Sequence, residues 1–179
     1  MTQDHEIMLS VKDGDVQKLE LLFDKYSKEV YGYFQFQIRD RLKSEDLVQN
    51  VFYNILKYRH TFKDGANFKV LMYTIAGNEK VKFFKNSKVL TSDMALEQSN
   101  EESSNPENDL EHKADLTNLN MALQMVSPHN RELIILSRFN GLLYSQISEI
   151  MGCKIGTLKV RMYRAIKELR AKFNKIAGE

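Results

Sequence analysis

The chain has 179 residues, of which 42% are hydrophobic and 28% are charged, and its formal net charge is +2. This composition excludes an intrinsically disordered chain and indicates a globular protein of one or two domains. No apolar run approaches the roughly 18 residues of a membrane-spanning helix, so we expect no membrane insertion. The N-terminus lacks the basic-then-apolar pattern of a signal peptide and Cys153 has no cysteine partner, so we expect a cytoplasmic protein.

The net charge hides a strong segregation along the chain. Residues 1–86 hold 14 basic and 12 acidic residues, whereas residues 87–115 hold 2 and 8. Residues 116–179 hold 10 basic and 4 acidic residues, a net charge of +6. We therefore expect a near-neutral N-terminal unit at 1–86, a flexible acidic linker at 87–115 and a basic C-terminal unit at 116–179 that contacts nucleic acid.

The apolar residues recur at helical spacing almost everywhere. The chain has only two prolines and eight glycines, so it has few of the residues that usually form the turns between strands. The sequence predicts an all-α fold. Beyond a short first helix, the expected helices cover residues 16–39, 44–59, 68–86, 115–126 and 129–139 and a pair within 141–169.

Residues 141–169 have the pattern of a helix-turn-helix. Ser145 is the expected N-cap of a short amphipathic helix, and Gly152 supplies the positive φ of a tight turn. A second helix is expected to restart near residues 155–157, with Leu158 and Met162 on its apolar face. In a helix-turn-helix the second helix enters the DNA major groove.

The opposite face of that second helix is polar and basic. It carries Thr157, Val160, Tyr163 and Arg164, with basic residues on its flanks. An αα-hairpin with a solvated basic face is the alternative, but exposed Val and Tyr between cations favour DNA.

The expected helix at 44–59 opens with Ser44 as its N-cap and has two faces. The inner one carries five apolar residues, namely Leu47, Val48, Val51, Ile55 and Tyr58. The outer one carries a polar stripe, namely Asp46, Gln49, Asn50, Tyr53 and Lys57. Taken alone, that stripe is typical of ordinary solvated surface.

The loop at 61–67 contains an Asp-Gly turn, and the helix after it mixes aromatic residues with lysines on its outer face. Tyr73, Lys80 and Phe84 belong to that face. Bases of unpaired nucleic acid stack on aromatic rings while cations hold the backbone. A second apolar seam packed on another helix is the alternative.

No feature of the sequence indicates an enzyme. The four histidines are scattered, and no metal-ligand spacing, phosphate-binding glycine loop or nucleophile elbow is present. We expect no catalytic residue, no metal and no cofactor.

Two motif blocks in this order resemble the extracytoplasmic-function (ECF) group of the sigma-70 family, the promoter-recognition subunits of bacterial RNA polymerase. The N-terminal block is EDLVQNVF at 45–52 with FKVLMYTIAGN at 68–78. The C-terminal block is SPHNRELIILSRFNGLLYSQISEIMGCKIGTLKVRMYRAIKEL at 127–169. The chain departs from the family pattern at Leu71, usually Trp, and at Gly77, usually Arg.

The resemblance implies an alternative sigma factor with three sets of site residues. Core polymerase would bind the outer stripe through Asp46, Gln49, Asn50 and Tyr53. The single-stranded −10 element would contact Phe62, Lys63, Asn67, Tyr73, Asn78, Lys80 and Phe84. The duplex −35 element would contact Thr157, Lys159, Val160, Arg161, Tyr163 and Arg164.

The same resemblance implies sigma region 2 at 1–86 and sigma region 4 at 116–179, and a cognate anti-sigma factor as a further partner. The alternatives left open are a free-standing helix-turn-helix regulator and an all-α enzyme.

Overall fold

The computed structural model describes residues 2–90 and 110–178, and within these ranges every regular element is helical. The expectation of an all-α fold is therefore confirmed. The helices fall into two compact units: α1–α4 form the first, and α5, α6, most of α7 and α8 form the second. The larger part of the expected linker, residues 91–109, lies outside the described residues.

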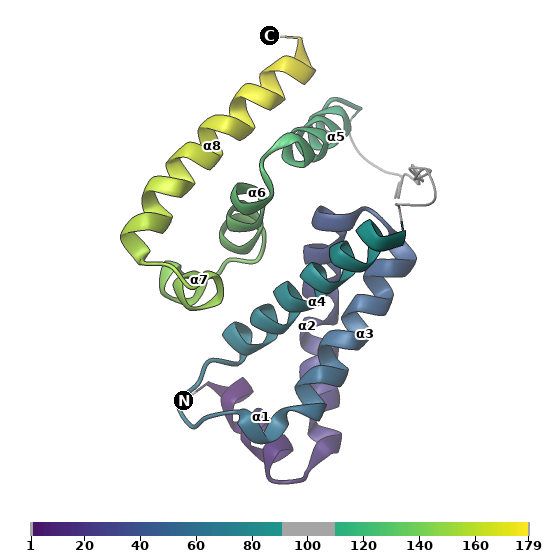
Figure 1. Cartoon of the computed structure of the whole chain (residues 1–179), viewed down its shortest axis with the longest axis vertical. Helices are drawn as coiled ribbons and strands as arrows, with labels where there is room; N and C mark the ends of the chain where they lie inside the picture. The colour runs from purple at the N-terminus through teal and green to yellow at the C-terminus, as the bar shows by residue number, and fades with distance from the viewer. Residues whose placement is uncertain (1, 91–109, 179) are drawn as a thin grey trace. The chain divides into compact units, whose positions relative to one another are not determined.

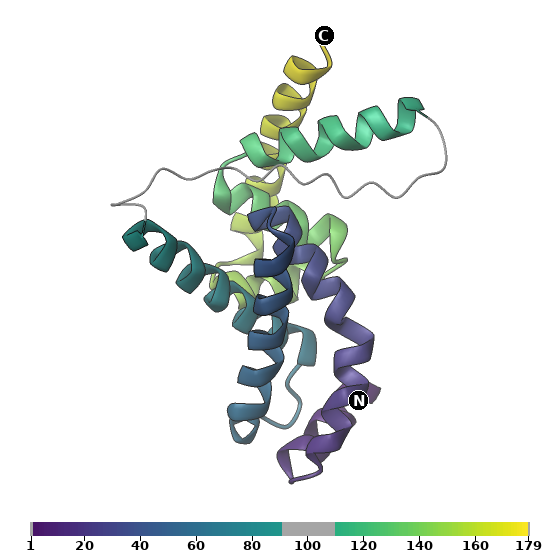
Figure 2. The same ribbon diagram turned by 90° about the vertical axis from the view of Figure 1, so that its right-hand side faces the viewer.

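The first unit is built from four α-helices and two short 3₁₀ turns (Figure 1). In chain order these are α1 (Gln3–Lys12), η1 (Val16–Lys18), α2 (Leu19–Ile38), α3 (Arg41–Lys57), η2 (Arg59–Thr61) and α4 (Phe68–Leu90). Helix α3 packs against both α2 and α4, and α1 contacts α2, η2 and α4. Figures 1 and 2 show α1 beside the end of this bundle at which α2 begins and α3 ends.

The core of the first unit consists of apolar side chains from all four helices. Because the apolar stripes face inward at helical spacing, their burial drives the packing. Fully buried members include Met8, Leu22, Val30, Tyr33, Phe34, Val51, Ile55, Phe68, Met72 and Ala76.

The start of α3 differs from the sequence-based expectation. Ser44 is completely buried inside the helix, where its hydroxyl accepts a hydrogen bond from Gln35 Nε2 at 2.8 Å. The N-cap is Asp40, whose carboxylate accepts from the Lys43 amide at 2.9 Å. Arg39, at φ 59°, ends α2 in the left-handed conformation, and the N-cap of α3 therefore comes four residues before the expected Ser44.

The second unit contains α5 (Leu110–Met125), α6 (Pro128–Ile134), the π-helical turn η3 (Ile135–Phe139), α7 (Tyr144–Met151) and α8 (Ile155–Ala177). Helix α8 packs against both α5 and α6, and Figure 2 shows α5 crossing it. The buried residues of this unit include Leu123, Leu133, Ile134, Leu136, Ile147, Leu158 and Ala165.

Three further helix boundaries correct the expectations. Helix α4 continues to Leu90 and α5 begins at Leu110, so the helices extend into the expected linker at both ends. Helix α7 begins at Tyr144 rather than after Ser145. The Gln146 side chain accepts a hydrogen bond from the Leu143 amide at 2.8 Å and so satisfies a donor ahead of the first turn.

Candidate nucleic-acid interface

Helices α7 and α8 form a helix-turn-helix with a tightly bonded turn. Gly152 has φ 61°, as expected for the residue that ends α7. The Cys153 amide donates to Ser148 O at 3.2 Å, and Ser148 Oγ donates to Cys153 O at 2.6 Å. Ile147 and Leu158 are fully buried on either side of the turn, so the angle between the two helices is fixed by packing.

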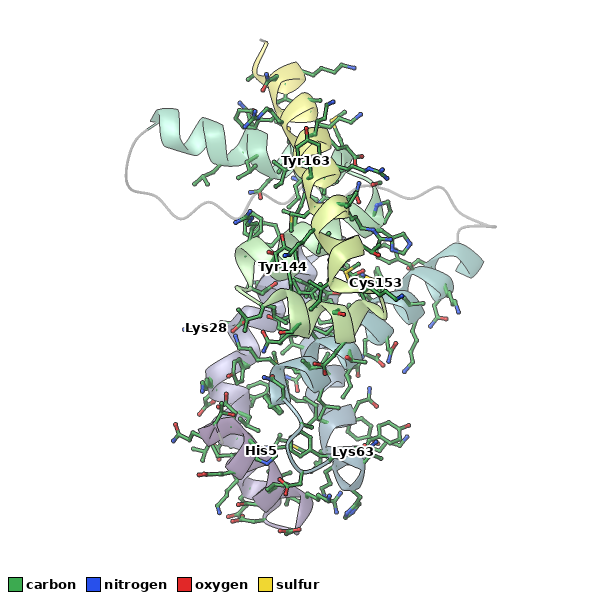
Figure 3. The ribbon with its side chains drawn as sticks, turned by 90° about the vertical axis from the view of Figure 1, so that its left-hand side faces the viewer. His5, Lys28, Lys63, Tyr144, Cys153 and Tyr163 are labelled. Carbon is green, nitrogen blue, oxygen red and sulfur yellow. The ribbon has the colours of Figure 1, made fainter. Side chains whose placement is uncertain are left out.

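The outer face of α8 presents the residues expected to read DNA. Tyr163 is 73% exposed and Val160 is 54% exposed. Thr157, Lys159 and Arg164 are also exposed, and Arg161 is half-buried. Within the described ranges no hydrogen bond or ion pair engages the side chain of Tyr163 or that of Arg164. Figure 3 shows Tyr163 at the surface of α8. This face therefore offers donors and a ring to a groove.

The outer face of α3 carries the four residues expected to bind polymerase. Asp46, Gln49 and Asn50 are exposed, and Tyr53 is 63% exposed. The inner face is buried as expected except at Tyr58, which is 51% exposed because α3 ends at Lys57. The expectation that Tyr58 joins the core is wrong.

Two residues expected to contact the −10 element are core residues instead. Tyr73 is completely buried, and its hydroxyl donates to Glu29 Oε1 at 2.7 Å. Phe62 is 2% exposed, with its ring 5.5 Å from that of His5. Because neither ring is accessible, neither can stack on a base, and these two assignments are wrong.

The other expected −10 residues lie at or near the surface. Lys63 and Asn78 are exposed, and Phe84 is 42% exposed. Lys80 is half-buried, with its ammonium 5.8 Å from the centre of the Tyr33 ring. Asn67 is exposed but already works as a helix cap, since its Oδ1 accepts from the Lys69 amide at 2.9 Å.

A surface pocket of about 350 Å³ opens between α3 and α4, and the sequence did not single it out as a site. Its lining includes Glu79, a carboxylate only 7% exposed, which accepts from Asn54 Nδ2 at 3.1 Å and from Lys82 Nζ at 2.5 Å. The hydrogen bond from Lys82 to Glu79 raises the pKa of that lysine. The only sequence signal is an acid amid the lysines of α4. The lining residues are Asn54, Tyr58, Ile75, Asn78, Glu79, Val81 and Lys82.

Within residues 2–90 and 110–178, no group of three or more His, Cys, Asp or Glu side chains could hold a metal ion. None of the helices in those ranges is both long and apolar enough to cross a bilayer.

A helix-turn-helix with an exposed aromatic and cationic face places the chain among DNA-binding proteins of transcription. Residues 116–169 match the family model "Sigma-70, region 4".

Three curated relatives align over most of the chain. The ECF RNA polymerase sigma factor BldN of Streptomyces coelicolor is 28% identical over 92% of this chain, and the chain spans 63% of its length. The sigma factor CarQ of Myxococcus xanthus is 25% identical over 89% of this chain and 91% of its own length. The ECF sigma-E factor of Escherichia coli is 26% identical (90% of each).

Solved structures agree. The sigma factor RpoE of Bartonella quintana, crystallised with the anti-sigma factor NepR, has a TM-score of 0.72 and 27% identity over 89% of this chain and 96% of its own. CnrH, solved with the cytosolic domain of CnrY, has a TM-score of 0.74 over 96% of this chain and 97% of its own. Because it is only 15% identical, this similarity supports the fold alone. Residues 116–169 therefore match sigma-70 region 4, and the chain is similar over most of its length to ECF sigma factors. Sigma factors, the class of protein to which these relatives belong, regulate transcription.

Proposed function

We propose that this chain binds core RNA polymerase and directs it to promoters by recognising a duplex −35 element and a single-stranded −10 element. The observation that carries the proposal is the exposed face of α8, where Tyr163, Val160 and Arg164 stand on a helix fixed by a buried turn. Such a face suits base-edge contacts in a major groove. Because polymerase and chromosome share the bacterial cytoplasm, we place the protein there.

The −35 contacts divide into two kinds. Lys159, Val160, Tyr163 and Arg164 face base edges, and the Val160 side chain suits a thymine methyl group. Thr157 and Arg161 suit phosphates, which set the register of the helix on the duplex but carry no sequence information.

The −10 strand meets the loop after η2 and the exposed part of α4. Lys63 and Lys80 hold phosphates, and Phe84 offers a ring for stacking. We place capture of an unstacked base in the pocket beside Asn78, where the amide side chains of Asn54 and Asn78 can meet a base edge. A base that is already unpaired costs little to capture.

Core polymerase docks on the outer face of α3 through Asp46, Gln49, Asn50 and Tyr53. An exposed tyrosine at the centre of a polar stripe is typical of a protein-binding surface, in which aromatic side chains dominate the binding energy. We also propose a cognate anti-sigma factor as a partner, which the complex of the Bartonella quintana relative with NepR supports.

Run-off transcription with purified core polymerase and a genomic promoter library tests this function. We expect transcripts only from reactions that contain both the chain and the core enzyme, and from a set of promoters that share two elements. The alternative, a free-standing helix-turn-helix regulator, predicts that the chain binds duplex promoter DNA tightly without polymerase and does not co-purify with the core enzyme.

A further inference from the structure

Helix α1 is bonded to the loop at 62–67 by two side chains that are far from it in sequence. His5 Nδ1 lies 3.0 Å from Ala66 O, and His5 Nε2 lies 2.9 Å from Asp64 Oδ1. Lys12 Nζ donates to Phe62 O at 2.6 Å. Loop and helix are therefore joined at both ends of the loop. Figure 3 shows His5 and Lys63 at the same end of the first unit, near this loop.

The His5 ring contacts three consecutive residues of the loop. Its two nitrogens lie within hydrogen-bond distance of the Ala66 carbonyl and the Asp64 carboxylate. The Gly65 amide lies 3.4 Å from Nε2 and also donates to Asp64 Oδ1 at 2.9 Å. One side chain of α1 therefore holds the turn of the loop.

The site is built around that ring. The His5 side chain is 4% exposed, whereas that of Asp64 is 80% exposed. The hydrogen bond from His5, followed by that from the Gly65 amide, lowers the pKa of Asp64. The buried ring, bonded to an exposed loop carboxylate, is a tether between α1 and the loop.

The other charged groups of the elements packed on α1 are already engaged. Asp4 pairs with Lys25 of α2 at 2.6 Å, and Lys69 of α4 pairs with Glu29 at 3.0 Å. Lys12 is the cation on the same helix that also faces the loop and adds to the lowering of the Asp64 pKa. Asp64 and Lys12 are therefore the charged side chains that bond across the contact between α1 and the loop.

We propose that His5 is a positioning residue for promoter recognition: with Lys12, it fixes the loop at 62–67 in the shape that presents Lys63 to the −10 strand. This inference rests on the proposed −10 function of that loop. A loop held in its bound shape before the strand arrives loses less conformational entropy on binding. Loss of the His5 contacts should consequently weaken binding of the −10 strand.

Four variants of the full-length chain test the tether. His5→Gln cannot bridge both acceptors, and Asp64→Asn changes only an exposed side chain, so that fold is retained. Lys12→Met removes the second bond, and Lys18→Met, whose ammonium pairs with Asp15 rather than the loop, is its matched control. The probe is a single-stranded −10 oligonucleotide bound to holoenzyme, with affinity for core polymerase measured alongside.

We expect His5→Gln and Asp64→Asn to weaken oligonucleotide binding about 3- to 10-fold while affinity for core polymerase is unchanged. Lys18→Met should behave as wild type.

The tether and the −10 function fail in different ways. If Lys63→Ala leaves oligonucleotide binding unchanged, the loop does not contact the strand and the proposed function of the loop is wrong. If Lys63→Ala weakens binding but His5→Gln and Asp64→Asn do not, the tether is wrong. Hydrogen exchange of the Ala66 amide, which bonds to Lys63 O at 3.1 Å, measures loop order without DNA and should accelerate in both variants.

Discussion

The Tyr73 hydroxyl donates a 2.7 Å hydrogen bond to the Glu29 carboxylate, and Lys69 donates to the same carboxylate at 3.0 Å. This bond joins α4 to α2 inside the first unit, and the Tyr73 ring has no exposed surface. Burial, followed by the nearby negative charge of Glu29, raises the pKa of Tyr73. Tyr73 therefore belongs to the fold and not to the surface that meets DNA.

The first prediction follows from that bond. Tyr73→Phe should lower the free energy of unfolding by about 1–3 kcal/mol, because a hydrogen bond to a charged acceptor is lost while the ring still fills its site. Urea unfolding measures the loss. Binding of the −10 oligonucleotide by holoenzyme should be unchanged at a temperature where the variant is folded, whereas Phe84→Ala should weaken it. A Tyr73→Phe variant of normal stability that binds DNA poorly would contradict this assignment.

The second prediction concerns polymerase docking. Asp46→Arg combined with Gln49→Ala should abolish co-purification with core polymerase, because both side chains are exposed on the outer face of α3. Circular dichroism should find the helical content intact. Lys57→Ala, also exposed on α3, is the matched control and should co-purify normally. Undiminished binding by the folded double variant would exclude this face.

The third prediction separates base reading from charge on α8. Arg164→Ala should weaken transcription from the cognate promoter roughly 5- to 150-fold and relax preference at one or two −35 base pairs, since a bidentate arginine–guanine contact is worth about 1–3 kcal/mol. Lys167→Ala removes the same charge but should lower affinity evenly across sequences and reduce the salt dependence. Equal losses from both variants on cognate and scrambled −35 duplexes would mean that α8 does not read sequence.

The fourth prediction concerns stability and pH in the second unit. Glu168 of α8 accepts hydrogen bonds from Asn130 Nδ2 at 2.7 Å and from the Ser127 amide at 2.9 Å, at the start of α6. The bond from Asn130, with those from Ser127, lowers the Glu168 pKa. A lowered pKa in the folded state gives stability that is present above the unfolded-state pKa, about 4.3, and is lost as pH falls through the folded-state value.

Glu168→Gln should therefore be less stable than wild type by about 0.5–1 kcal/mol at neutral pH, and the difference should shrink below about pH 4. Chemical unfolding of both proteins across pH measures this. Glu149→Gln, an exposed acid on α7, should show a smaller difference at every pH. A Glu168→Gln deficit that does not vary with pH would contradict the carboxylate's role.

Much of this protein follows from local sequence alone. Helical spacing of apolar residues fixes which faces are buried, so the all-α fold and the exposed face of α8 at Val160, Tyr163 and Arg164 could be predicted. Gly152 marks the turn because positive φ is a property of the residue itself. The outer stripe of α3 could be predicted for the same reason as its buried face.

Tertiary structure decided the rest, because a side chain's partner on another helix leaves no mark in local periodicity. Tyr73 is buried against Tyr33 of α2, and Glu29 of the same helix satisfies its hydroxyl. Ser44, a good capping residue, is internal because Asp40 follows the left-handed Arg39 and accepts the capping bond first. His5 becomes a tether because folding brings it to an acid and a carbonyl about 60 positions away. Sequence sets which faces are apolar, whereas the pairing of polar groups depends on contacts that only the packed chain creates.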